Sequence, residues 1–193
     1  IKDLTPAAIV DIFAQQAARD TLFVRVWLSS IVNRLLGVGP KYSTEGKRKG
    51  LAQVLGSPLA DTAMKDLALP RRNGAPVKVF IVGFDYDQQR ATFFRSYRSN
   101  SGLAPADLSL LDAIHASSTA PVNFFDQPAT VGVHRYWDGG VSGYNNPVMG
   151  AVVEAMIDGA APKAIQALSL GTGTVRLAPR DAEGTPPDEL RQP

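Results

Sequence analysis

Three short apolar runs, each closed by a turn or by glycines, constrain the fold of this chain of 193 residues more than any other feature. They occupy residues 77–86, 131–137 and 165–170 and are rich in Val, Ile, Leu and aromatic side chains. Runs of this length are typical of β-strands that are buried on both faces. Because helical patterns alternate with them along the chain, we expect an α/β domain.

Amphipathic spacing of apolar residues predicts the helices, and a polar turn predicts one hairpin. Residues 91–97 follow the first strand after an Asp-Gln-Gln-Arg turn, so the two segments are expected to pair. Helices are expected over residues 5–13, 23–36, 51–55 and 107–115, and after Asn145-Asn146-Pro147. We expect one domain over residues 1–175 and a flexible tail over 176–193, where Pro and acidic residues occur without periodicity.

Composition excludes several classes of function. The absence of cysteine excludes a disulfide scaffold, a thiolate nucleophile and a Cys-ligated zinc site, and it favours an intracellular setting. The net charge of +2 is too small to indicate nucleic-acid binding. No apolar run reaches the ~18–20 residues that a membrane span needs. The chain begins at Ile1 without an initiator Met, so we expect a segment that precedes it.

A cluster of basic residues lies at positions 41–49, directly before the apolar helical pattern. Its cations are Lys41, Lys47, Arg48 and Lys49, against the single acidic residue Glu45. One interpretation is a solvated helix face, and the other is contact with anionic lipid headgroups. The number of charges does not decide between them.

Asp138 is the residue that carries the most chemical information. It ends an apolar strand and is followed directly by Gly139 and Gly140, and ligands in open α/β sheets bind at such carboxyl ends of strands. A carboxylate there suits a general base or a metal ligand, and the glycines allow a close approach of the backbone. The alternative is an Asp-Gly turn of type I′ without a chemical role. Asn145-Asn146-Pro147 is likewise either a helix cap or a source of amides that orient Asp138.

The other candidate residues carry weaker signals. His115 and His134 are the only histidines, and neither has acidic or histidine neighbours in the sequence at metal-ligand spacing. We therefore expect structural roles for both, and neither a metal nor a cofactor. Gly171-Thr172-Gly173-Thr174 lacks the Lys-Ser/Thr ending of a phosphate-binding loop, so nucleotide binding is not expected. Ser117-Ser118 has no nucleophile elbow around it, and no Gly-x-Ser-x-Gly occurs anywhere in the chain.

Four ordered pieces of the chain resemble motifs of the patatin-like phospholipase family. They are residues 111–121 with Phe124-Phe125 after them, Tyr136-Trp137-Asp138-Gly139-Gly140, Asn145-Asn146-Pro147, and residues 167–173 with the sequence Ala-Leu-Ser-Leu-Gly-Thr-Gly. The resemblance extends over roughly residues 5–175, and the ordered combination is more specific than any single piece.

The resemblance implies a three-layer α/β/α fold with a mainly parallel sheet, of which the N-terminal strands would precede this chain. It also implies lipid acyl hydrolysis by a Ser–Asp dyad in which Asp138 is the base, Gly139 and Gly140 and residues 145–147 support it, and a lipid or acyl ester is the substrate. The family's nucleophilic serine and oxyanion loop would lie before Ile1, so we expect this chain to be inactive alone. The alternative is a non-catalytic module of the same fold that binds lipid or a protein partner. Peripheral contact with a membrane surface is expected, and a nucleic-acid partner is not.

Overall fold

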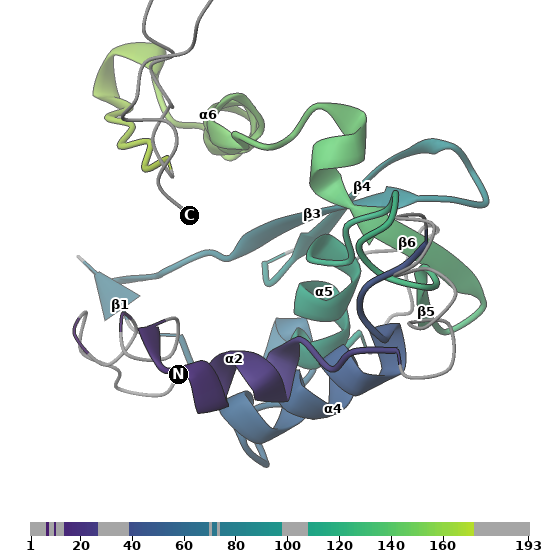
Figure 1. Cartoon of the computed structure of the whole chain (residues 1–193). Helices are drawn as coiled ribbons and strands as arrows, with labels where there is room; N and C mark the ends of the chain where they lie inside the picture. The colour runs from purple at the N-terminus through teal and green to yellow at the C-terminus, as the bar shows by residue number, and fades with distance from the viewer. Residues whose placement is uncertain are drawn as a thin grey trace, which may run out of the picture.

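The computed structural model shows a layered α/β arrangement (Figure 1). It describes residues 14–26, 39–69, 71–72, 74–97 and 108–171, together with the single residues Ala7 and Val10. Most of the two helices predicted over 5–13 and 23–36, and all of the tail predicted over 176–193, lie outside these residues. Within them, no helix is both long enough and apolar enough to span a membrane.

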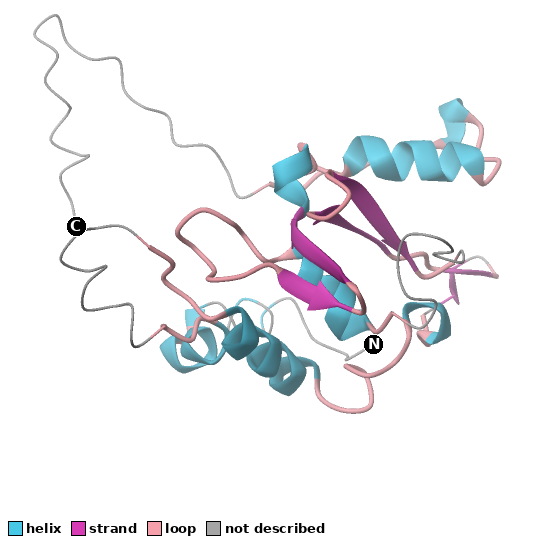
Figure 2. Ribbon diagram, turned by 90° about the vertical axis from the view of Figure 1, so that its right-hand side faces the viewer, coloured by secondary structure: helices cyan, strands magenta, loops and turns pink. Residues whose placement is uncertain are grey.

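A four-stranded sheet forms the middle layer. Its strand order is β4 (Arg90–Arg95), β3 (Phe80–Asp85), β6 (His134–Asp138), β5 (Ala129–Val131), and every neighbouring pair is antiparallel. On one face lie α5 (Leu110–Ser117), α4 (Thr44–Leu55) and α2 (Gln16–Leu22), and on the other lies α6 (Val148–Ile157) (Figure 2). A separate two-stranded sheet pairs β1 (Arg71–Arg72) with β2 (Ala75–Pro76).

The strand pairings confirm one prediction and correct another. The hairpin expected from residues 77–86 and 91–97 is present as β3 and β4. The apolar run 131–137 is not one strand, because it turns back on itself at Gly132-Val133, where Gly132 has a φ of 61°. Such short connections force antiparallel neighbours, whereas a parallel pair needs a crossover of a dozen residues or more. The described sheet therefore does not support the expected mainly parallel order.

The third predicted strand is absent from the described residues. Residues 165–170 have no strand assignment, and the side chains of Leu168 and Leu170 are 84% and 85% exposed. Strands form only where a neighbour accepts and donates their backbone hydrogen bonds, and no described strand lies beside this segment. The prediction of a buried strand here was wrong for that physical reason.

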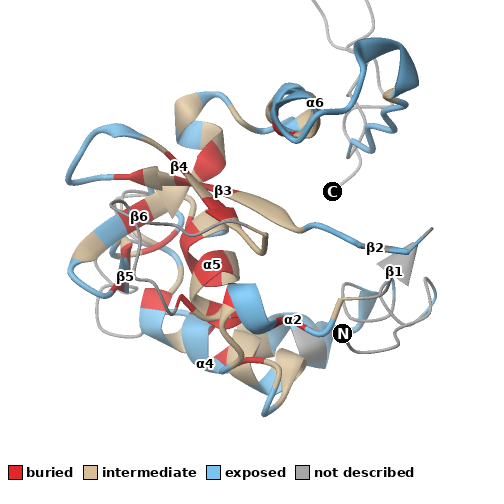
Figure 3. Cartoon of the chain, turned by 180° about the vertical axis from the view of Figure 1, so that it is seen from behind, coloured by how far each residue is buried: buried red, intermediate tan, exposed pale blue. Residues whose placement is uncertain are grey.

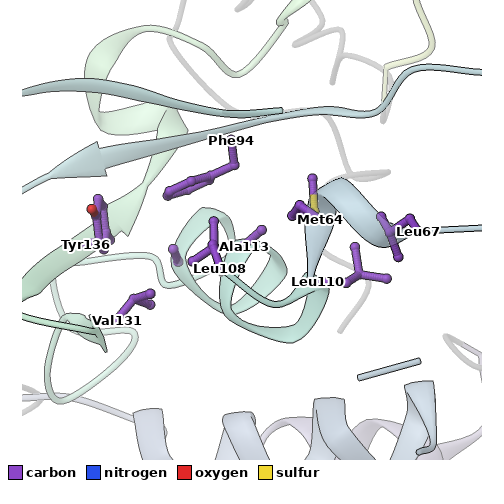
Figure 4. Packing of buried hydrophobic residues seen from close by; sticks show 9 residues of the cluster. Met64, Leu67, Phe94, Leu108, Leu110, Ala113, Val131 and Tyr136 are labelled. Carbon is purple, nitrogen blue, oxygen red and sulfur yellow. The ribbon is translucent and has the colours of Figure 1, made fainter. Parts of the chain in front are cut away.

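The hydrophobic core lies between the sheet and α5. Phe94 of β4 and Tyr136 of β6 are both fully buried and meet edge to face, with 5.4 Å between their ring centroids (Figure 4). The helix contributes Leu110, Ala113 and Ala116 from the face that it turns to the sheet. Buried positions concentrate at this layer, as Figure 3 shows. Deleting a large core side chain of this kind typically costs ~3–5 kcal/mol.

Side-chain caps fix where the two central helices begin. Ser109 Oγ accepts a hydrogen bond from the backbone N–H of Asp112 at 3.0 Å and donates one to its carboxylate at 2.8 Å, so α5 starts at Leu110 rather than at 107. Ser43 Oγ accepts from the N–H of Gly46 at 3.1 Å at the start of α4. These caps satisfy N–H groups that a helix end otherwise leaves without partners.

Charged groups attach α6 to the other face of the sheet. Glu154, buried in the middle of α6, accepts hydrogen bonds from Arg95 Nη2 at 2.6 Å, from Arg95 Nε at 3.0 Å and from the Tyr97 hydroxyl at 2.8 Å. Burial and the bond to Glu154 raise the pKa of Tyr97 to about 12, so the phenol remains a donor at neutral pH. Lys78 forms an ion pair with Asp158 at the end of the helix.

Replacing Glu154 by Gln is expected to lower the free energy of unfolding by about 2 kcal/mol, because Arg95 loses a partly buried charge-assisted partner. Urea titration followed by circular dichroism measures the change. Glu45→Gln is the matched control, since Glu45 pairs with Lys49 on the exposed surface of α4, and such pairs contribute about 0.5 kcal/mol or less. Equal losses in the two variants would contradict the role assigned to Glu154.

Candidate functional site

Asp138 lies where β6 ends and the 3-10 turn η2 (Gly139–Ser142) begins. Its backbone N–H donates to the carbonyl of Thr119 at 2.8 Å, and its Oδ1 accepts from the N–H of Gly140 at 2.7 Å. The type I′ hairpin turn that the sequence left open is therefore not formed, because the chain continues into η2. Two backbone contacts hold the carboxylate at the carboxyl end of the strand, and Oδ2 accepts no hydrogen bond from the described residues.

The two glycines after Asp138 are required by close packing. A Cβ on Gly139 would lie 2.6 Å from the carbonyl oxygen of Val82 on β3, and a Cβ on Gly140 would lie 2.4 Å from Asn145 Oδ1. Real Cβ atoms do not approach backbone or amide oxygens so closely. The glycines thus allow the turn to press against the sheet on one side and against Asn145 on the other.

Residues 145–147 perform one of the two roles that the sequence left open, the start of α6. No hydrogen bond joins Asn145 or Asn146 to Asp138 among the described residues, so the orienting role stays a prediction. Asn146 Oδ1 accepts from the N–H of Val148 at 3.1 Å, and Pro147 occupies the cap position of α6. Asn146 Nδ2 also donates to Ser169 Oγ at 3.0 Å, which ties the helix start to the segment 165–171. Asn145, by contrast, packs against Gly140 and so borders the turn that positions Asp138.

Lys47 of α4 is buried beside this turn. Only 4% of the residue is exposed to solvent. Its ammonium nitrogen donates hydrogen bonds to the carbonyl of His115 at 3.1 Å, to Ser118 Oγ at 3.1 Å and to Thr119 Oγ1 at 2.5 Å. The same nitrogen lies 4.5 Å from the centre of the Phe125 ring. Lys47 thereby connects α4 to the segment whose Thr119 carbonyl holds Asp138.

Burial lowers the pKa of Lys47 to about 7, and attraction to Asp138 partly opposes this effect. Neither interpretation of the basic cluster at residues 41–49 anticipated a buried lysine. Helical spacing in the sequence could have predicted this burial, because Lys47 shares a face of the helix with the apolar residues Leu51 and Val54. The other cations do lie at the surface, where Arg48 pairs with Asp112 at 3.0 Å.

The burial of His115 and the hydrogen bonds of the exposed Ser118 agree with structural roles for both residues. His115 is 2% exposed inside α5, and burial together with the nearby cations Lys47 and Arg48 lowers its pKa to about 3. Ser118 Oγ donates to the carbonyl of Ile114 at 2.6 Å while it accepts from Lys47. Neither side chain is arranged as a base–nucleophile pair with Asp138.

His134 has acidic neighbours that the sequence analysis did not find. Its Nδ1 lies 3.4 Å from Asp85 Oδ2, and Asp87 completes a cluster in which one potential ligand atom of each residue lies within 4.8 Å of the others. Asp85 and Asp87 are far from His134 in the sequence, and the pairing of β3 with β6 brings them together. His134 and Asp138 share a face of β6, as expected, but they lie at opposite ends of the strand.

An apolar cavity of about 500 Å³ lies next to the Asp138 turn. Asn145 and Asn146 border it at one end, Val148 and Val152 line it from α6, and residues 165–171 form the opposite wall. Because Asn145 also packs against Gly140, the cavity reaches the loop that carries the carboxylate. Of the segment considered for nucleotide binding only Gly171 is described, and residues 172–174 lie outside the described part of the chain.

A family model described as patatin-like phospholipase matches residues 2–152, which include Lys47, Asp138 and the two glycines after it. No curated protein matches the chain.

The buried lysine predicts a specific dependence of stability on pH. Between pH 7 and 10.5 the unfolded chain retains the Lys47 proton that the folded chain has released, so the free energy of unfolding is expected to rise with pH. The slope contributed by this one group is at most about 1.4 kcal/mol per pH unit. Lys47→Met removes this contribution, which urea titrations between pH 7 and 10 measure as the difference from the unaltered chain.

Lys49→Met is the control, because Lys49 lies on the same helix with 73% of its side chain exposed. It should leave the pH dependence of stability unchanged. Parallel stability curves for Lys47→Met and the unaltered chain would contradict the assigned pKa of Lys47.

Proposed function

The chain belongs to the patatin-like phospholipase family, and from this premise we propose that it serves lipid acyl hydrolysis with Asp138 as the general base. The family assignment indicates a lipid hydrolase in general. The assignment of the base rests on one observation, the placement of a carboxylate at a strand end with both its backbone N–H and its Oδ1 already held. A base fixed in this way loses little entropy when the substrate binds.

In the proposed reaction Asp138 acts directly on a serine hydroxyl, without a histidine between them. The carboxylate takes the hydroxyl proton while the serine oxygen attacks the ester carbonyl, and a tetrahedral oxyanion forms. As this species collapses to an acyl-serine, the protonated Asp138 returns its proton to the departing alkoxide, which leaves as the alcohol. Water then attacks the acyl-serine while Asp138 accepts a proton from it, and Asp138 passes this proton to the departing serine oxygen, which releases the fatty acid and restores the serine hydroxyl. The burial of His115 within α5 supports a mechanism that does not use it.

The nucleophile is proposed to come from a polypeptide segment outside these 193 residues. The sequence contains no Gly-x-Ser-x-Gly, and Ser118, which follows α5, is hydrogen-bonded to the carbonyl of Ile114 and to Lys47. A missing nucleophile costs several orders of magnitude in rate. We therefore propose that this chain alone does not hydrolyse esters.

The cavity beside the Asp138 turn is the proposed site for the acyl chain. Its volume of about 500 Å³ falls within the range of small-molecule sites. Its walls are mainly aliphatic, with polar groups at the Asn145 end that borders the turn. In this proposal the ester group of a bound lipid lies at the Asn145 end, toward Asp138, and its hydrocarbon tail lies along the aliphatic side chains of α6.

The test of the base compares four chains with p-nitrophenyl butyrate as substrate. The 193-residue chain is expected to show no hydrolysis above background. A polypeptide that continues upstream of Ile1 through a Gly-x-Ser-x-Gly is expected to be active, and Asp138→Asn in it should lower kcat about 100- to 10,000-fold. The exposed Asp61→Asn variant is the control and should retain full activity. Near-normal turnover of Asp138→Asn would refute the assignment of the base.

The second candidate is a lipid-binding module without catalysis, which the apolar cavity and the missing nucleophile both favour. Val152→Glu places a charge in the cavity and is expected to weaken binding of a fluorescent fatty acid at least tenfold. Val153→Glu is the matched control, because Val153 is the next residue of α6 and does not line the cavity. Fluorescence titration measures both affinities. Equal loss in the two variants would contradict fatty-acid binding in this cavity.

Experiments on the polypeptide that continues upstream of Ile1 distinguish the two candidate functions. Fatty-acid binding by the 193-residue chain together with hydrolysis by the longer polypeptide supports the hydrolase. Binding without hydrolysis by either chain supports the module.

A further inference from the structure

The cluster formed by Asp85, Asp87 and His134 lies at the opposite end of β6 from Asp138, and the proposed hydrolysis does not use it. Asp85 is the last residue of β3, Asp87 lies in the turn that leads to β4, and His134 is the first residue of β6. Four residues of an extended strand span about 13 Å, so this cluster is distinct from the candidate active site.

Asp85 is a fully buried carboxylate, and one of its oxygens accepts no hydrogen bond from the part of the chain that the structure describes. Its Oδ1 accepts from the backbone N–H of Gln88 at 2.9 Å, whereas this other oxygen, Oδ2, faces His134 Nδ1 at 3.4 Å. A buried carboxylate is strongly unfavourable unless a cation or several donors compensate for it. Arg135 does not serve Asp85, because its guanidinium pairs with Asp87.

The carboxylate of Asp87 is stabilised in its charged form, and its Oδ2 retains a lone pair that can bind a metal ion. Hydrogen bonds from Arg135 lower the pKa of Asp87. Its Oδ2 accepts one hydrogen bond, from the backbone N–H of Arg135 at 2.9 Å, and a carboxylate oxygen can accept two. Hydrogen bonds of this kind commonly orient carboxylates that bind metals.

We propose that Asp85, Asp87 and His134 bind a divalent first-row transition metal ion that joins the end of β3 to the start of β6. Two carboxylate oxygens and one imidazole nitrogen are a mixed ligand set that suits Zn²⁺ better than Mg²⁺ or Ca²⁺, which prefer oxygen alone. Two ligand atoms of a tetrahedral Zn²⁺ lie about 3.4 Å apart, and Asp85 Oδ2 and His134 Nδ1 already have this separation.

The site is accessible from one side only. The side chains of Asp87 and His134 are 31% and 24% exposed, while that of Asp85 is fully buried. The ion therefore enters past Asp87 and His134, and water completes its coordination. Because the ligands come from the β3–β4 turn and from the start of β6, binding stabilises the folded sheet.

The test is calorimetric titration of Zn²⁺ into the full chain after removal of metals with EDTA. We expect one ion per chain, a higher melting temperature with Zn²⁺, and binding of Mg²⁺ at least tenfold weaker. His134→Gln and Asp87→Asn should each weaken Zn²⁺ binding at least tenfold, and both avoid changing the buried Asp85. Asp61→Asn, an exposed carboxylate elsewhere, should leave the affinity unchanged.

Nitrogen NMR of the two imidazoles provides an independent readout. On addition of Zn²⁺ the Nδ1 resonance of His134 is expected to shift, while the buried His115 serves as an internal control. Absence of stoichiometric Zn²⁺ binding would overturn the proposal and leave a simple contact between Asp85 and His134. Retained affinity in both variants, or Mg²⁺ binding as tight as Zn²⁺ binding, would equally overturn it. These outcomes do not depend on whether the chain takes part in ester hydrolysis.

Discussion

Burial of the Lys47 ammonium is the interaction on which the arrangement around Asp138 depends. The nitrogen donates hydrogen bonds to the carbonyl of His115 and to the hydroxyls of Ser118 and Thr119 at the end of α5. Thr119 in turn presents its carbonyl to the N–H of Asp138. The position of the carboxylate thus depends on a side chain of α4, which acts through the end of α5.

Strand β3 connects the candidate base Asp138 with the cluster of Asp85, Asp87 and His134. It pairs with β4 on one side and with β6 on the other, so Gly83 lies opposite Asp138 and Asp85 lies opposite Tyr136. One end of the β3–β6 pair carries the candidate base, and the other end carries the cluster around Asp85. A single register between the two strands therefore sets the geometry of both sites.

Local patterns in the sequence predicted the features that depend on neighbouring residues. The β3–β4 hairpin and the turn after Asp138 follow from contiguous apolar and polar segments. Lys47 was missed because a run of charges normally marks solvent, and only its long-range contacts make burial possible. The cluster of Asp85 and His134 could not be predicted either, since strand pairing brings these residues together. The mainly parallel sheet came from family resemblance alone, and the short turns within the described sheet give antiparallel order instead.

Two ion pairs of α6 with the described residues differ in how much water surrounds them. Arg95 and Glu154 are 22% and 11% exposed, whereas Lys78 and Asp158 at the end of the helix are 46% and 20% exposed. Dissolved salt screens exposed pairs far more than partly buried ones. High ionic strength consequently weakens the attachment of α6 at its last residues while its middle stays anchored. Residues 165–171 follow that end and form one wall of the cavity, so the end of α6 nearest this wall in the chain is also the end where the surrounding electrolyte acts more strongly.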